Sequence, residues 1–393
     1  MRVDHLILQG HKDLLRAPRR CLLVSRTARQ PVPNTPWVQA VVAAVRTASQ
    51  AGEVLVTGAG REPFDLALHV CAQAGGACIV VLEAAPELCV HWSETRTILP
   101  ANHLLAWPIE GSASPLFERD HQMALLADRA TSIQVRKGGH MEGLATELRQ
   151  RNVTIASGPV YAPPPQMRSP IKPARRTESQ PAFVPDPALR LDGAYLCHFT
   201  REPDGPWPGE SYVEYLGWLA GGTSVEAGNV AERAGPRDAA QTLARILRMR
   251  RLLASGRLMP AKTPLVSFSA RTPHELLERI AWRRGLRRWT FRPYGLAVRQ
   301  SALEALGARP VRYLSPSELK TLPADARLFG QKHQPPGCDW SGEAEWRLRG
   351  DLDLSTLRPG DFLALVPTPE EARAFEREFG VKTLALGIPS ARA

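Results

Sequence analysis

The sequence of 393 residues lacks any uninterrupted apolar run approaching the roughly 20 residues that span a bilayer. The charged residues Asp4, Lys12 and Asp13 stand where a signal peptide would need an apolar core, so no leader is expected. The 6 cysteines are scattered, without close pairs and without histidine at zinc-finger spacing. We therefore expect a cytoplasmic protein that holds no metal and buries its cysteines as small apolar residues.

The chain is not evenly charged, although its composition, with 44% hydrophobic and 23% charged residues, is that of a globular protein. Residues 1–161 hold 16 Lys and Arg against 14 Asp and Glu, whereas residues 237–312 hold 17 against 4. Such a basic excess suits a phosphate-rich partner, although a solvated helix face can carry the same charges. The residues expected to contact nucleic acid are Arg248, Arg251, Arg284, Arg287 and Arg288.

Apolar runs and helical periodicity alternate along residues 1–161. The pattern predicts buried strands at 21–25, 54–58, 78–82 and 131–135, and helices at 36–50, 64–74, 117–129 and 140–150. This alternation is typical of an α/β fold with a doubly wound, parallel, Rossmann-like sheet, whose ligand lies at the carboxyl ends of the strands.

Residues 162–190 contain 8 prolines and little that could form a core, which indicates a linker. Residues 191–393 then predict a second, α+β domain. Its expected helices are 237–255 and 273–284, and its expected strands are 264–269, 294–299, 310–314 and 362–366.

Small residues follow the first and second predicted strands of the N-terminal domain. Glycine at such a position lets a phosphate approach the backbone N–H groups closely, and the next helix N-terminus favours negative charge. Of the residues expected to bind a nucleotide-type ligand, this pattern supplies Ser25, Arg26, Gly58 and Gly60, and the family resemblance described next adds Arg119, Gly138 and Gly139. Asp65 and His69 lie on a predicted helix, where a structural role is at least as reasonable as ligand contact.

The order Ser25-Arg26, Thr57-Gly58-Ala59-Gly60, Glu118-Arg119 and Gly138-Gly139 resembles the DNA-processing and Lonely Guy superfamily of Rossmann domains, over about residues 20–160. Members bind nucleotides, ADP-ribose-like signals or single-stranded DNA, and some cleave nucleotide N-glycosidic bonds. Enzymatic members follow the paired glycines with Gly-Thr and then a glutamate. This chain has His140-Met141-Glu142-Gly143-Leu144-Ala145 instead, so the resemblance implies binding more than hydrolysis.

Three separated patches of the C-terminal half invite one chemical explanation: Cys197–Arg201, Ser267–Ser269 and Glu343–Arg347. Attack at the anomeric carbon of NAD releases nicotinamide and builds positive charge on the ribose. A carboxylate that bonds the ribose hydroxyl stabilises this charge, and a second glutamate can activate the acceptor. The alternative is that Glu345 and Arg347 form a surface ion pair beside a buried Trp346, and that Ser267-Phe268-Ser269 is an ordinary strand that alternates its faces.

These patches, with Tyr294-Gly295-Leu296-Ala297-Val298 and Gly307–Tyr313, resemble the ADP-ribosyltransferase superfamily over about residues 195–370. Within that superfamily it is the DNA-modifying toxins and the abortive-infection proteins of bacteria that these segments resemble, and the similarity is strongest to the abortive-infection group. It implies that Glu345 is the catalytic carboxylate and that Glu343 holds the acceptor. The residues that the resemblance assigns to NAD binding are His198, Thr200, Ser267, Ser269 and Tyr294.

The two resemblances together imply that a Rossmann-like domain senses a nucleotide or nucleic acid while the C-terminal domain transfers ADP-ribose from NAD to nucleic acid, as an antiphage toxin effector. Two alternatives stay open. One is a single-stranded nucleic-acid-binding protein without catalysis. The other is a nucleotide N-glycosidase in the Rossmann domain that uses Glu118 and Arg119. A protein partner or a homo-oligomer is compatible with all three.

Overall fold

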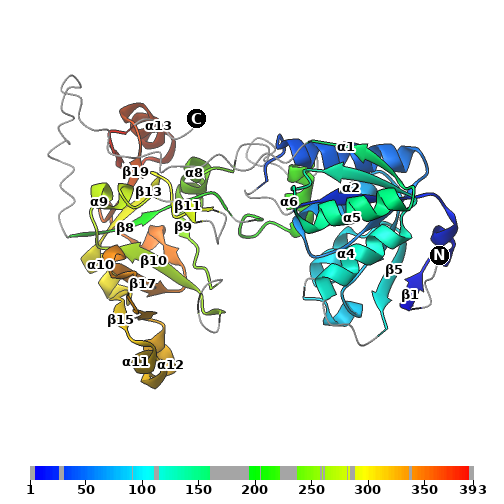
Figure 1. Cartoon of the computed structure of the whole chain (residues 1–393). Coiled ribbons are helices and arrows are strands. Elements are labelled where there is room, and N and C mark those ends of the chain that lie inside the picture. Colours follow the sequence, from blue (N-terminus) through cyan, green and yellow to red (C-terminus); the bar gives the residue numbers. More distant parts are fainter. Residues whose placement is uncertain are drawn as a thin grey trace. The chain divides into compact units, whose positions relative to one another are not determined.

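The computed structural model describes residues 5–25, 31–90, 92–109, 115–159, 194–203, 205–221, 237–256, 259, 262–280, 282–283, 288–335 and 339–388. The chain divides into two compact units (Figure 1). Unit 1 comprises Met1–Pro165 and Gly205–Gly235, and unit 2 comprises Gln166–Asp204 and Pro236–Ala393. No described helix is both long enough and apolar enough to cross a bilayer.

Unit 1 is built on a mixed, mostly parallel sheet of 7 strands in the order β1-β5-β4-β3-β2-β6-β7. Every neighbouring pair is parallel except β1 and β5. The strand order reverses between β2 and β6, and such a switch point is where open α/β sheets usually bind ligands. The strands are β1 (Leu6–Gly10), β2 (Arg19–Val24), β3 (Val54–Thr57), β4 (Ala77–Val81), β5 (Asn102–Pro108), β6 (Arg129–Ile133) and β7 (Thr154–Ser157).

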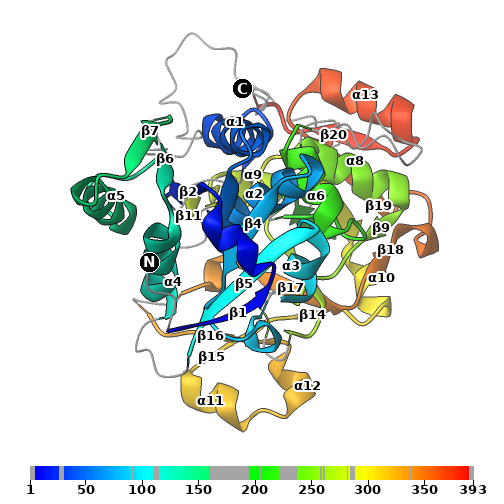
Figure 2. The same cartoon turned by 90° about the vertical axis from the view of Figure 1, so that its right-hand side faces the viewer.

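Helices cover both faces of this sheet. In Figure 2, α1 and α2 lie on one side and α4 and α5 on the other. The helix α1 buries Val38, Val41, Val42 and Val45, whose spacing of three and four residues makes one apolar stripe. The helical segments are η1 (Lys12–Arg16), α1 (Pro36–Gln50), α2 (Glu62–Gln73), η2 (Pro86–Leu88), α3 (Trp92–Thr95), η3 (Arg96–Ile98), α4 (Pro115–Leu126) and α5 (His140–Gln150).

The sequence patterns locate the four central strands and the four long helices of unit 1, and the expected bounds of α1 and α5 agree with the structure residue for residue. The expectation of a parallel sheet is confirmed for all neighbouring pairs except one, because β1 is antiparallel to β5. The strands β1, β5 and β7 escaped the sequence analysis. The apolar run of β5 is short and flanked by polar residues, and most side chains of the edge strands β1 and β7 are not buried.

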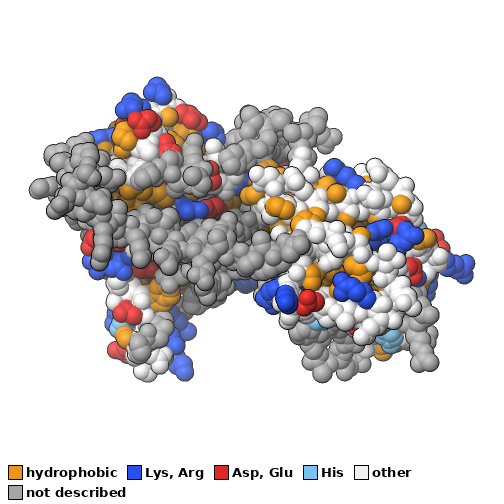
Figure 3. All heavy atoms as spheres, turned by 45° about the horizontal axis from the view of Figure 1, so that its top comes forward, with side chains coloured by type: hydrophobic (Ala, Val, Ile, Leu, Met, Phe, Trp, Pro, Cys, Tyr) orange, Lys and Arg blue, Asp and Glu red, His pale blue; other side chains and the backbone are white. Residues whose placement is uncertain are grey.

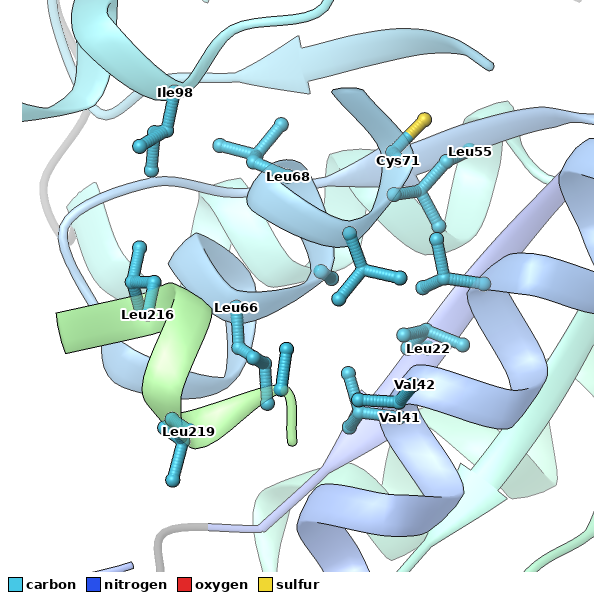
Figure 4. Packing of buried hydrophobic residues seen from close by; sticks show 14 of the residues in the cluster. Leu22, Val41, Val42, Leu55, Leu66, Leu68, Cys71, Ile98, Leu216 and Leu219 are labelled. Atoms are coloured by element: carbon cyan, nitrogen blue, oxygen red, sulfur yellow. The ribbon is translucent and has the colours of Figure 1, made fainter. Parts of the chain in front are cut away.

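A helix from beyond the proline-rich segment completes unit 1. This helix, α6 (Tyr212–Leu219), buries Tyr215, Leu216, Trp218 and Leu219 in the same apolar cluster as α1 and α2. Figure 4 shows Leu216 and Leu219 beside Leu66 of α2. The observed division therefore differs from the expected one, which placed all of residues 191–393 in the second domain. The region between β4 and β5 supplies only short helical segments, so α6 covers apolar surface of α2.

Unit 2 contains a second sheet of 7 strands, in the order β14-β17-β10-β8-β13-β19-β20. It is antiparallel except between β19 and β20. Apolar residues of α8 and α13 pack on one face, and those of α9 on the other. The sheet strands are β8 (Tyr195–Phe199), β10 (Leu265–Ser269), β13 (Gly295–Arg299), β14 (Arg309–Pro310), β17 (Glu345–Arg349), β19 (Phe362–Val366) and β20 (Thr383–Ala385).

Three strand pairs and several helices surround that sheet. The pairs are β9 (Arg251–Leu252) with β18 (Leu352–Asp353), β11 (Trp282–Arg283) with β12 (Arg288–Trp289), and β15 (Arg312–Leu314) with β16 (Gly330–Lys332). The helical segments are α8 (Ala239–Met249), α9 (Pro273–Leu277), α10 (Gln300–Ala305), α11 (Pro316–Thr321), α12 (Ala324–Arg327), η6 (Ser341–Glu343), η7 (Leu354–Thr356) and α13 (Pro369–Phe379).

Three sequence expectations for unit 2 are wrong. The helix expected over 237–255 ends at Met249, and β9 then pairs with β18. The helix expected over 273–284 ends at Leu277, and residues beyond it pair as β11 with β12. The strand expected over 310–314 divides at Val311: β14 pairs with β17, whereas β15 pairs with β16. In each case strand pairing overrides the local pattern.

Four cysteines are buried, and Cys89 is half-buried. Burial raises the pKa of the Cys21 thiol to about 12. Cys338 lies outside the described residues.

Candidate active site

A fork between two neighbouring strands of unit 2 opens a cavity. The ladder between β8 and β10 contains a single residue pair, Cys197 with Ser269. Beyond it, the His198 ring replaces the backbone ladder, and its Nδ1 lies 2.8 Å from the carbonyl oxygen of Ser267. Consecutive residues of both strands line a cavity of about 460 Å³, within the range of roughly 300–1,000 Å³ usual for small-molecule sites.

Glu345 is held in place on the wall of this cavity by several hydrogen bonds. The Ser267 hydroxyl donates to its Oε1 at 2.7 Å, and Arg347 donates to Oε1 and Oε2 at 2.9 Å each. The backbone N–H of Glu345 donates to the Tyr313 hydroxyl at 2.9 Å. Among the described residues, three hydrogen bonds thus reach a carboxylate that has about four acceptor positions, which leaves Oε2 able to accept one more.

The sequence left open that Glu345 and Arg347 form a surface ion pair. In the structure the two residues are paired, but the pair does not lie on the surface. Their side chains are only 15% and 4% exposed, and Trp346 between them packs partly against the apolar core. The register explains their shared position: Ser269 lies opposite Glu345, and Ser267 lies opposite Arg347. Because side chains alternate across a strand, all four point to one face of the sheet.

His198 has a defined tautomer in this arrangement. Burial lowers the pKa of the His198 ring, so it is neutral near pH 7. The Ser267 carbonyl can only accept, and therefore Nδ1 carries the proton and donates. This leaves Nε2 as an acceptor.

The remaining cavity wall combines charged and aromatic side chains. The Ser269 hydroxyl donates to the Glu343 carbonyl at 2.5 Å, which anchors the turn before Glu345. Phe291 stacks on Phe199 with ring centroids 5.3 Å apart. The other charged and aromatic lining residues are Arg201, Phe268, Arg279, Trp340 and Glu343.

The structure brings together five of the seven residues that the sequence assigns to the NAD reaction: His198, Ser267, Ser269, Glu343 and Glu345. Thr200 and Tyr294 do not line this cavity. The buried Thr200 hydroxyl donates to the carbonyls of Ala239 and Tyr294, and the Tyr294 hydroxyl donates to Glu371 at 2.8 Å. Both residues therefore hold the fold together. Arg279, Phe291 and Trp340 escaped the sequence analysis because each is a single residue outside any motif.

Unit 1 has a separate cavity, of about 430 Å³, at the carboxyl ends of β3 and β4. The Arg119 side chain, 1% exposed, crosses this edge and donates to Glu83 at 2.8 Å and to Asp120 at 2.8 Å. The cavity wall includes Ala59, Gly60, Arg61, Leu82, Glu83, Leu88, Cys89, Trp92 and Arg119. Gly58 lies against Arg119, since a Cβ there would come within 3.1 Å of its Nε.

The other residues expected to bind a nucleotide lie elsewhere on unit 1. The Ser25 hydroxyl accepts from the backbone N–H of Arg136 at 2.8 Å and so joins β2 to the loop after β6, across the switch point. The Gly138 N–H donates to Glu142 at 2.6 Å. A carboxylate of the chain thus occupies one N–H group that a phosphate would use. Gly139, the residue before α5, does not line the 430 Å³ cavity, and Arg26 lies outside the described residues.

Asp65 and His69 both lie in α2, and Asp65 has a structural role there. Asp65 accepts from the Gly60 N–H at 2.9 Å and from the Tyr212 hydroxyl, and His69 is buried.

Of the basic residues expected to contact nucleic acid, the structure describes the side chains of Arg248 and Arg251. Arg248 pairs with Glu378 at 3.0 Å, and Arg251 pairs with Asp351 at 2.9 Å. On the face shown in Figure 3, the basic groups of the described residues are small and separated, and acidic groups lie beside several of them. Arg284, Arg287 and the side chain of Arg288 lie outside the described residues.

No protein-family model matches this chain, and no curated protein matches it. Among solved structures, about 39% of the chain, in its N-terminal region, resembles DNA processing protein A from Streptococcus pneumoniae, with 17% identity and a TM-score of 0.33. This chain covers 54% of that protein.

Two further structures are similar at the same level. DNA processing protein A from Helicobacter pylori, described for its single-stranded DNA binding mode, has 15% identity, a TM-score of 0.33, and coverage of 39% of this chain and 70% of that one. The molybdenum cofactor carrier protein from Chlamydomonas reinhardtii has 18% identity, a TM-score of 0.25, and coverage of 36% and 76%. These similarities do not bear on the cavity of unit 2.

Proposed function

We propose that unit 2 cleaves the bond between nicotinamide and ribose in NAD and transfers ADP-ribose to an acceptor. One observation carries the proposal: Glu345, fixed by Ser267 and Arg347, lies with His198 on the wall of one cavity at the fork of β8 and β10. Residues separated by up to 147 positions in the sequence thus meet where a carboxylate and a sugar could interact.

The donor set fits a ribosyl substrate. Oε2 of Glu345 can accept a hydrogen bond from a ribose hydroxyl, and its negative charge stabilises the positive charge that builds on the sugar as the bond to nicotinamide breaks. Nε2 of the neutral His198 is an acceptor for a second hydroxyl. The aromatic walls formed by Phe268, Phe291 and Trp340 suit a flat heterocycle.

The transfer step balances with the groups present. The bond between the anomeric carbon and the nicotinamide nitrogen breaks, and its electron pair leaves with nicotinamide. An oxygen or nitrogen of the acceptor forms the new bond to that carbon, and its proton passes to Glu343, the second carboxylate of the cavity. When the acceptor is water, the same step is hydrolysis.

The test is nicotinamide release from NAD by the full chain, with single-stranded DNA, duplex DNA or RNA added as acceptor. Glu345→Gln keeps the shape of the side chain but removes the charge, and we expect it to lower release by about 10²-fold or more. Glu378→Gln, on an exposed residue of the same unit outside the cavity, is the matched control and keeps full activity. Equal release by the wild type and Glu345→Gln would refute the proposal, as would no release by the wild type with any acceptor.

We also propose that the 430 Å³ cavity of unit 1 binds a nucleotide-type ligand. It combines an apolar and aromatic wall, Leu82 and Trp92, with the charged pair of Arg119 and Glu83 and the turn at Gly60, which has a positive φ of 74°. These are the complementary groups for a base and for polar sugar or phosphate atoms.

Binding of AMP, ADP-ribose and a single-stranded oligonucleotide to the full chain, measured by calorimetry, tests this second proposal. Glu83→Gln removes the charge beside Arg119 and is expected to change the affinity at least tenfold. Glu87→Gln, four residues away and exposed, leaves it unchanged. The proposal fails if none of the three probes binds, or if both variants bind like the wild type.

A further inference from the structure

Arg347 uses every one of its hydrogen-bond donors. Two N–H groups go to Glu345: Nε to Oε1 and Nη2 to Oε2, at 2.9 Å each. The other three N–H groups donate to β16 and to Leu328, just before that strand. Nη1 donates to the carbonyl oxygens of Leu328 and Gly330, at 2.8 and 3.2 Å, and Nη2 donates to Oε1 of Gln331 at 2.8 Å. A guanidinium has five donors in a rigid plane, so its orientation is fully determined.

The acceptors of Arg347 belong to a part of unit 2 outside the cavity. The segment that runs from β15 through α11 and α12 to β16 leaves the main sheet and returns to it, and none of its residues lines the cavity. The same segment supplies Tyr313, whose hydroxyl accepts from the backbone N–H of Glu345. Both the backbone and the carboxylate of Glu345 are therefore tied to it.

We infer that Arg347 is a positioning residue for Glu345, and that it transmits the geometry of the β15–β16 segment to the carboxylate. This inference rests on the transfer reaction proposed above. Arg347 does not line the cavity, so it acts through Glu345 and not on the substrate. A fork that holds both carboxylate oxygens fixes the plane of the carboxylate, which the single hydrogen bond from Ser267 does not.

Lysine cannot replace this fork, because its ammonium group is a point charge that cannot bond both oxygens and three distant acceptors in one plane. Arg347→Lys preserves the charge but releases the carboxylate. Misplacement of a catalytic group by about 1 Å can cost about 10²-fold in rate. We therefore expect kcat to fall by about 10–100-fold, with KM for NAD changed by less than about threefold.

The kinetic experiment compares the wild type, Arg347→Lys and Arg349→Lys in the full chain. Arg349 is the next residue on the same strand face, and its side chain is 67% exposed, so its variant should behave like the wild type. In Arg347→Ala, guanidinium added at tens of millimolar should raise kcat at least tenfold above its value without guanidinium. Gln331→Leu, which removes one acceptor of Arg347, serves if those variants do not fold, and should lower kcat severalfold.

Crystal structures of the wild type and of Arg347→Lys separate this inference from the proposed reaction. We expect the 2.7 Å contact between Ser267 and Glu345 in the wild type, and its loss in the variant. If the Glu345 carboxylate has not moved in the variant, the inference is overturned. It is also overturned if KM for NAD rises while kcat stays unchanged. If the wild type releases no nicotinamide, the proposed reaction fails, and the two structures alone decide whether Arg347 positions Glu345.

Discussion

The hydroxyl of Tyr212, in α6, donates a hydrogen bond of 2.9 Å to the carboxylate of Asp65, in α2, although 147 residues separate them. Asp65 also accepts from the N–H of Gly60, in the loop that lines the cavity of unit 1. The next tyrosine of α6, Tyr215, donates to Glu62 at 2.6 Å. The helix α6 is thus joined to the first turn of α2 by two tyrosine–carboxylate bonds as well as by apolar packing.

A double-mutant cycle measures the Tyr212–Asp65 bond. Tyr212→Phe removes the donor and leaves a part-buried carboxylate with one partner fewer, so we expect a loss of about 1.5–3 kcal/mol in the free energy of unfolding of unit 1. Asp65→Asn and the double variant complete the cycle in urea unfolding. Single effects that simply add, within about 0.5 kcal/mol, would show that the bond contributes nothing.

Residues 1–161, produced alone, are expected to be unstable. Without α6, the apolar surface of α2 around Leu66 and Val70 is uncovered. Exposed apolar patches promote aggregation, so the fragment should bind an apolar dye such as ANS and elute as aggregates in size-exclusion chromatography. A fragment of residues 1–235, which includes α6, is the matched comparison and should be monomeric. Cooperative unfolding of the shorter fragment at the same temperature would contradict this expectation.

Glu53 makes unit 1 sensitive to acid. Its side chain is 3% exposed and pairs with Arg20 and Arg129 at 2.5 Å each. The hydrogen bond from Arg20, aided by Arg129, lowers the pKa of this carboxyl below 4.5. A carboxyl with a lowered folded pKa stabilises the fold above its unfolded pKa, and this contribution is lost as the pH falls through the folded value.

We therefore expect Glu53→Gln to lower the free energy of unfolding by roughly 1.5–3 kcal/mol at pH 7, since it removes the charged acceptor of Arg20 and of the half-exposed Arg129. The difference between the wild type and the variant should shrink below about pH 4.5. Urea unfolding between pH 3 and pH 7 checks this, and a difference that does not depend on pH would exclude the ion pair as its cause.

The sequence assigns Tyr294 to NAD binding, whereas the structure gives it a role in the core of unit 2. Its hydroxyl bonds Glu371, and the side chain is buried in the core of unit 2. Tyr294→Phe should therefore cost about 1–3 kcal/mol of stability, while the affinity for NAD stays within about twofold of the wild type. Thermal unfolding and NAD titration of the same preparation separate the two effects. A large loss of affinity with unchanged stability would return Tyr294 to the binding site.

The sequence predicts best where one period governs a long segment. The apolar stripe of α1 and the buried run of β4 fix their elements locally, and both were located from pattern alone. The motif around Glu345 was identified differently, from the resemblance of Glu345-Trp346-Arg347 to a segment of the ADP-ribosyltransferase superfamily, and the strand β17 that carries it was not predicted. What motif reading could not supply was the partner strand, and hence the fork at His198.

Long-range pairing accounts for what the sequence did not predict. The edge strand β7 has mostly exposed side chains, so its pattern resembles a loop. The residues of α6 were assigned to the second domain, whereas they belong to unit 1. Their apolar side chains pack into a core formed by residues far earlier in the chain, which the local sequence does not indicate. Arg279, Phe291 and Trp340 reach the cavity of unit 2 from three separate segments, which no spacing rule connects.

The return of the chain to unit 1 has a consequence for synthesis on the ribosome. When residue 165 has left the exit tunnel, the sheet of unit 1 is complete but α2 has not yet received α6. By the time α6 emerges, β8 has already been made, and it must wait for β10 and β13, its neighbours in the sheet. Neither nascent core can close in a single vectorial pass, so early chaperone protection should matter more here than for two domains encoded one after the other.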